Sequence, residues 1–79
     1  LVQIEDLLAG RYVGQYICHL WEENDEEVFY HGRIRKYLKG KKSYVISYWG
    51  ESESFDDASD FTFPAFKLAT DFYLKDLTI

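Results

Sequence analysis

The stretch that most constrains the fold is residues 43–51, Ser-Tyr-Val-Ile-Ser-Tyr-Trp-Gly-Glu. Aromatic and β-branched residues favour strands, and a glycine followed by an acidic residue is typical of a strand end. The stretch therefore predicts a β-strand that stops at Gly50. Two large aromatic rings and a carboxylate meet where this strand turns, and such a group can receive a cation.

Three further segments predict strands, in a chain of 79 residues that suits one small domain with a thin core. They are residues 12–21, residues 28–38 and a closing strand at residues 77–79. The acidic run 22–27 predicts a solvated hairpin loop, and the basic run 39–42 predicts a tight turn. Gly32, inside the second strand, predicts a bulge or a sharp bend.

Two segments predict helix. Residues 1–10 place apolar side chains at helical spacing, which indicates a short N-terminal helix or the end of a linker. Residues 52–71 predict an acidic loop and then a helical insert beginning near Pro64, with Phe66, Ala69 and Phe72 or Tyr73 on its buried side. The whole pattern predicts a mainly β chain, a small and strongly bent antiparallel barrel with a short helical insert near its C-terminus.

The overall charge narrows the class of partner. The formal net charge is −5, which disfavours general binding to nucleic acid and favours a basic peptide. Cys18 is the only cysteine, so no internal disulfide is possible. The chain also contains no methionine, and we expect it to be a piece of a longer protein.

The sequence carries little that points to catalysis or metal binding. His19, His31 and Cys18 are too few, and lack the spacing, for a tetrahedral metal site. Cys18 and His19 are neighbours, so on a strand their side chains lie on opposite faces and do not make a nucleophile–base pair. We expect a binding module without catalytic residues, metal or cofactor.

Three motifs taken together resemble the Tudor domains. They are Gly-Gln-Tyr-Ile-Cys-His-Leu-Trp at residues 14–21, Phe-Tyr-His-Gly-Arg-Ile at residues 29–34, and Tyr-Val-Ile-Ser-Tyr-Trp-Gly-Glu at residues 44–51. The closing Leu-Lys-Asp-Leu at residues 74–77 is similar to the turn that ends many members. Two features depart from the family: a longer first hairpin loop, and residues 52–71 where members have a short fourth strand.

The resemblance implies an SH3-like barrel that reads methylated lysine or arginine through an aromatic cage. By position it places Trp21, Tyr30 and Tyr48 as cage walls, with Trp49 or Glu51 as a further ring or polar partner. Rings replace the hydration shell of a methylammonium group, and a carboxylate can bond an N–H that methylation has left. The alternative is that these rings are core or rim aromatics of a small barrel.

The partner implied is a basic peptide such as a histone tail, and the location a nuclear, chromatin-associated protein. Acidic side chains near the cage would steer such a peptide toward it. The same acids also suit a plainer role, which is to keep a small domain soluble. The candidate steering residues are Glu22, Glu23, Asp25 and Glu53.

Two other functions remain open. Residues 33–42 hold six of the nine positive side chains, and a nucleic acid or an acidic protein could bind there, although a solvated hairpin is the favoured explanation for them. A structural module would instead dock on another chain or domain through exposed phenylalanines, with an incomplete cage. The positive side chains of residues 33–42 are Arg33, Arg35, Lys36, Lys39, Lys41 and Lys42. The phenylalanines that would make the docking surface are Phe61, Phe63, Phe66 and Phe72.

Overall fold

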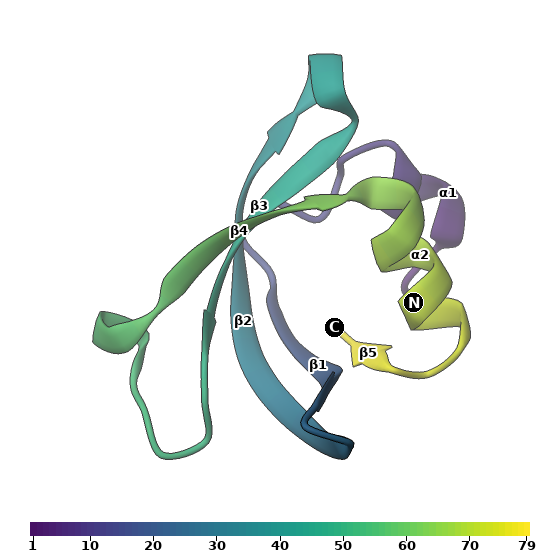
Figure 1. Ribbon diagram of the computed structural model, residues 1–79. Coiled ribbons are helices and arrows are strands. Elements are labelled where there is room, and N and C mark those ends of the chain that lie inside the picture. Colours follow the sequence, from purple (N-terminus) through teal and green to yellow (C-terminus); the bar gives the residue numbers. More distant parts are fainter.

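Five antiparallel strands form one sheet in the computed structural model, which describes residues 1–79 (Figure 1). The spatial order is β4-β3-β2-β1-β5, and β4 and β5 are the two edges, so the sheet is open. The prediction of a mainly β, antiparallel chain is therefore confirmed. The strands are β1 (Tyr16–Glu23), β2 (Glu26–Leu38), β3 (Ser43–Trp49), β4 (Ser59–Pro64) and β5 (Leu77–Thr78).

The β1–β2 hairpin is tighter than expected. Its turn consists of Asn24 and Asp25 alone, and both have positive φ, at 48° and 64°. Two such residues suit the mirror-image turns whose twist matches that of the flanking strands, so pairing continues to Glu23 opposite Glu26. The prediction of a long loop at residues 22–27 is wrong in extent, although all six residues are exposed to solvent.

A fourth strand lies within residues 52–71, where a loop and a helical insert were predicted. β4 pairs with β3 from Ser59 opposite Tyr48 to Pro64 opposite Ser43. Phe61 and Phe63 alternate with polar residues, as a half-buried strand requires. The acids that precede it form a short loop with a single 3₁₀ turn, η2 (Phe55–Asp57).

Two α-helices lie side by side next to the sheet (Figure 1): α1 (Ile4–Leu8) and α2 (Ala65–Tyr73). The predicted N-terminal helix is thus present, and α2 begins directly after Pro64 as expected. The buried side of α2 agrees with the prediction at Ala69 and at Phe72, which was the alternative to the 77% exposed Tyr73, but not at Phe66, which is 68% exposed. Helical geometry explains this, since one face repeats at every third or fourth position. That face consists of Ala65, Leu68, Ala69 and Phe72.

Gly32 plays a different part from the one predicted. The bulge in β2 lies between Ile34 and Lys36, and Gly32 itself pairs regularly with Ile17 and Tyr48. A Cβ atom on Gly32 would lie 2.8 Å from Cγ1 of Ile17 and 3.2 Å from Cγ2 of Ile46. The glycine therefore leaves room for the side chains of Ile17 and Ile46, from the two flanking strands, to close over β2.

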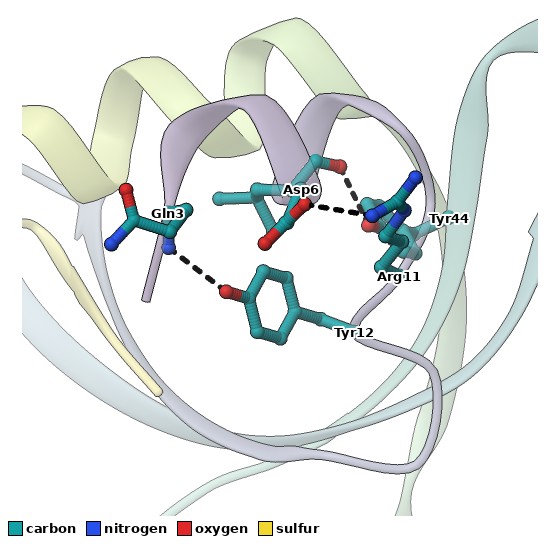
Figure 2. A network of polar contacts seen from close by, with 6 residues as sticks. Gln3, Asp6, Arg11, Tyr12 and Tyr44 are labelled. Atoms are coloured by element: carbon teal, nitrogen blue, oxygen red, sulfur yellow. Dashed lines mark hydrogen bonds and ion pairs between the residues drawn. The ribbon is translucent and has the colours of Figure 1, made fainter. Parts of the chain in front are cut away.

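The core lies between the sheet and the two helices, and the N-terminal segment is bonded to it. The hydroxyl of Tyr44 donates to the carbonyl of Leu7 at 2.6 Å, and the hydroxyl of Tyr12 accepts from the backbone N–H of Gln3 at 2.9 Å (Figure 2). Burial raises the pKa of Tyr44, which keeps its hydroxyl protonated as the donor. The core residues are Leu7, Ile17, Ile34, Tyr44, Ile46, Tyr48, Phe63, Ala65, Leu68, Ala69 and Leu77.

The basic turn between β2 and β3 contains a 3₁₀ turn, η1 (Lys39–Lys41), and closes with Lys42 at a positive φ of 48°. None of the helices is both long and apolar enough to span a membrane.

Candidate functional site

An open pocket of about 410 Å³ lies against the inward-facing side chains of four strands. Strands place alternate side chains on one face, so β1 and β4 each contribute two residues that are two apart, and β2 and β3 contribute one residue each. The connection from β3 to β4 closes one side. The lining residues are Trp21, Glu23, Tyr30, Tyr48, Glu53, Asp57, Ser59 and Phe61.

Aromatic rings make up half of this lining. The ring centres of Trp21 and Tyr48 are 5.5 Å apart at an interplanar angle of 89°. Phe61 lies 6.2 Å from Trp21 and 5.9 Å from Tyr48, at 43° and 72°. Rings set at steep angles to one another support each other edge to face and still present faces to a shared space.

Three carboxylates line the same pocket, and no lysine or arginine does. Glu23 accepts a hydrogen bond from the Tyr30 hydroxyl, and this bond is the largest cause of a raised pKa at Tyr30. Glu53 accepts from the backbone N–H of Gly50 at 2.7 Å, and Asp57 accepts from the backbone N–H of Ser54 at 3.0 Å. Each of these carboxylates uses one oxygen in these bonds, so its second oxygen is free for a ligand.

Tyr48 is held from behind by a buried histidine. Nδ1 of His19 lies 2.7 Å from the Tyr48 hydroxyl, and Nε2 of His19 lies 2.7 Å from Oδ2 of Asp71 on α2. A carboxylate can only accept, so Nε2 carries the hydrogen, and in the neutral ring Nδ1 accepts from the tyrosine O–H. Burial raises the pKa of Tyr48.

His19 is 1% exposed, and this burial lowers its pKa despite the opposing influence of Asp71. Desolvation disfavours the imidazolium form, so the neutral tautomer described above is the one that the fold selects. The hydrogen-bonded group of His19, Tyr48 and Asp71 was not predicted from the sequence. One signal was present, because His19 shares the inward face of β1 with Ile17 and Trp21 and so had to find polar partners.

The predicted cage residues fall into two sets. Trp21, Tyr30 and Tyr48 come together in the pocket. Trp49 and Glu51 lie outside it. Trp49 follows Tyr48 directly on β3 and so points to the opposite face, where its ring is 6.0 Å from His31 and 5.4 Å from Phe55.

The predicted steering acids also divide. Glu23 and Glu53 line the pocket, while Glu22 and Asp25 are exposed on the β1–β2 hairpin beyond it. Asp57 and Ser59 also line the pocket and were missed, because only the folded β3–β4 connection brings them beside Trp21.

The four phenylalanines predicted for docking do not form one surface. Phe61 lines the pocket, Phe63 is buried, and Phe72 packs against the core. Phe66 lies in a separate, shallow groove of about 340 Å³ between α1 and α2. That groove is lined by Ile4, Leu8, Phe66, Ala69, Thr70 and Tyr73.

The structure contains no group of three or more His, Cys, Asp or Glu side chains arranged to hold a metal ion. Compared with known proteins, the chain matches no family model, no curated protein sequence and no solved structure.

Proposed function

We propose that this chain is a Tudor-like reader module that binds a methylated lysine or arginine side chain of a basic peptide, such as a histone tail. The bent sheet would be an SH3-like barrel with a helical insert, and the parent protein would act on chromatin in the nucleus. The observation that carries the proposal is one pocket lined by four aromatic rings and three carboxylates, with no basic group.

The rings suit a cation that is poorly hydrated. Methylation removes N–H donors and bound water from an ammonium or guanidinium group but leaves its charge, and each good contact with a ring face is worth about 0.5–2 kcal/mol. Trp21, Tyr48 and Phe61 pack against one another with ring centres 5.5–6.2 Å apart and together line the pocket. The cage in this proposal is Trp21, Tyr30, Tyr48 and Phe61.

The carboxylates suit the charge of the same ligand. Glu23, Glu53 and Asp57 give the pocket a local charge of opposite sign to a methylated side chain, and their free oxygens can accept any N–H that methylation has left. A ligand that retains an N–H would therefore bind better than a fully methylated one. In this proposal Glu53 and Asp57 are the polar partners of the methylated group, a role for which the resemblance to Tudor domains suggested Glu51.

The proposal is for a binding module and not an enzyme. The side chain best suited to proton transfer near the pocket, His19, is buried and uses both ring nitrogens in hydrogen bonds. It supports a wall of the pocket and does not line it.

The test is a titration of the domain with mono-, di- and trimethylated lysine peptides and dimethylated arginine peptides, followed by calorimetry and by the two indole N–H resonances. We expect the Trp21 signal to shift with a methylated peptide and to stay in place with the unmodified peptide.

A matched pair of variants makes the test specific. Trp21→Leu should abolish the binding, whereas Trp49→Leu, which changes the same residue type on the other face of the sheet, should retain it. Phe61→Leu should weaken binding about 2–30-fold, as the loss of one ring contact implies, and Phe66→Leu should not. Equal effects within either pair, or no binding of any peptide, would reject the cage.

A further inference from the structure

The face of the sheet that points away from the pocket carries a second set of aromatic and basic side chains, here called the outer face. Alternation along β2 places Phe29, His31 and Arg33 on it, and β1 and β3 add Tyr16 and Trp49. The pocket and the outer face are thus opposite sides of the same strands.

The β2 bulge concentrates positive charge on this face. Ile34 pairs with Ile46 and the next pair is Lys36 with Val45, so Arg35 is the extra residue. A bulge sets two residues against one and re-aims a side chain. Arg35 and Lys36 consequently lie together opposite Val45, next to Arg33, and both are exposed.

The rings of the outer face are open to solvent. Tyr16, Phe29 and Phe55 are 60%, 48% and 44% exposed, and Trp49 is half-buried between His31 and Phe55. Exposed rings that gather in one patch mark an interaction surface, whereas single exposed rings do not. These rings are spaced across three neighbouring strands and the loop beside them.

Two arginines lie against these rings instead of against acids. The guanidinium carbon of Arg33 is 4.6 Å from the Tyr16 ring centre, and that of Arg35 is 5.3 Å from the Phe55 ring centre. The ion pair of Arg11 with Asp6 lies elsewhere, and neither outer-face arginine has an acidic side chain within ion-pair distance. The outer-face arginines are thus held in place with most N–H donors unused.

The net charge of −5 hides a separation of charge. Residues 33–42 contain six of the nine positive side chains and no acid. Three of the acids line the pocket on the other face. The outer face also carries acids: Asp60, which accepts from Ser47 beside Arg33, and Glu22 and Glu27 toward the β1–β2 hairpin. Around Arg33, Arg35 and Lys36 the positive side chains outnumber the one acid, Asp60, and the η1 lysines add further positive charge along the β2–β3 hairpin.

We propose that the outer face binds single-stranded nucleic acid. Unpaired bases would stack on Trp49 and the exposed rings around it, and phosphates would contact Arg33, Arg35 and Lys36, as in sheets that serve as stacking platforms. The bases of a duplex are stacked on one another and cannot stack on protein side chains, and an acidic peptide has no bases to stack on the exposed rings. A single strand is the polyanion that uses both features.

The experiment is fluorescence anisotropy of the whole domain with labelled oligouridine and oligothymidine of about ten nucleotides, a length typical of single-strand sites. A duplex of equal length and a polyglutamate competitor are measured alongside. We expect both single strands to bind more tightly than the duplex, and polyglutamate to displace them poorly. The ratio of the two single strands reports the combined contribution of the 2′-hydroxyl and of the thymine C5-methyl group.

Variants separate stacking from charge. Trp49→Leu should weaken binding about tenfold, as the loss of one stacked base implies. The double variant Arg33→Gln with Arg35→Gln should weaken nucleic-acid binding. It should also make the fall of log affinity with log salt less steep by about 1.4, which corresponds to the loss of two phosphate contacts. The matched control, Lys67→Gln with Lys75→Gln, removes the same charge from α2 and the turn after it, and should change neither quantity.

The pocket and the outer face can fail independently. Trp21→Leu should leave nucleic-acid binding unchanged, so a failed cage says nothing against the outer face. Equal binding of duplex and single strand, displacement by polyglutamate at equal charge, an unchanged affinity in Trp49→Leu, or no binding to either single strand would each overturn the proposal. Phe55→Leu, at a more exposed ring, serves if Trp49→Leu fails to fold.

Discussion

Nε2 of His19 on β1 and Oδ2 of Asp71 on α2 lie 2.7 Å apart, although 52 residues separate them in the chain. The other ring nitrogen of His19 meets the hydroxyl of Tyr48 at the same distance. One buried imidazole therefore joins the helix to a wall of the pocket. The hydrogen on Nε2 sets the direction of both bonds and hence the position of the Tyr48 ring.

The first prediction concerns stability and pH. Burial lowers the pKa of His19 below its ordinary value of 6.5, so the unfolded chain binds a proton there before the folded protein does. The contribution of His19 to the free energy of unfolding is complete above pH 6.5, and it is lost as the pH falls from 6.5 through the pKa of His19 in the folded protein. Asp71 and Asp76 oppose this shift and Lys67 supports it.

Urea unfolding at about pH 7.5 and about pH 5.5 checks this prediction, because the linkage acts in that window. The free energy of unfolding should fall by more in the natural protein than in His19→Gln. His31 is present in both and cancels in the comparison. A natural protein that loses no more stability than His19→Gln would contradict the prediction.

Tyr48→Phe should separate folding from binding. The change leaves Nδ1 of His19 buried without a donor, which should lower the free energy of unfolding by about 1–3 kcal/mol. The ring remains in the pocket, so methylated-peptide affinity should stay within about threefold at a temperature where the variant is folded.

The control for Tyr48→Phe is Tyr37→Phe, whose hydroxyl makes a longer and exposed bond of 3.4 Å to the Leu8 carbonyl. It should lower stability by less than about 1 kcal/mol. Chemical denaturation measures both changes. If the two variants unfold alike, His19 does not depend on the Tyr48 hydroxyl.

Glu53→Gln tests the charge of the pocket. Glutamine keeps an oxygen that can accept from the Gly50 N–H, so the β3–β4 connection should stay folded. Loss of one partly exposed charge should lower methylated-peptide affinity by up to about fivefold, and the difference should shrink as salt is added. Glu51→Gln is the matched control outside the pocket, and calorimetry that finds both variants equally affected would count against the assignment.

Gly32→Ala tests the close packing over β2. The new methyl group would lie 2.8 Å from Ile17 and 3.2 Å from Ile46, so the core must shift to admit it. Such overpacking should lower the free energy of unfolding by about 1–3 kcal/mol. Gly40→Ala is the control, since nothing lies within 4 Å of its Cβ position. Thermal unfolding of the two variants at the same midpoint would refute the close approach.

Local pattern in the sequence accounts for much of the fold. Aromatic and β-branched runs predicted β1, β2 and β3, although β1 begins at Tyr16 and not at Tyr12, and helical spacing predicted α1 and α2. The alternation of Phe61 and Phe63 with polar residues is also typical of a strand and indicates β4. The acidic residues before them favoured the prediction of a loop instead. Strand period likewise places Tyr48 and Trp49 on opposite faces, and so separates the pocket from the outer face.

The contacts across the fold were decided by tertiary structure alone. The sequence placed Trp21, Tyr30 and Tyr48 on strand faces, but not Phe61, Glu53 and Asp57 beside them, because the path of the β3–β4 connection depends on how β4 pairs. The bond from His19 to Asp71 exists only because α2 packs back onto the sheet. Local propensity acts between near neighbours, whereas a site shared by four strands and a helix depends on packing between distant parts of the chain.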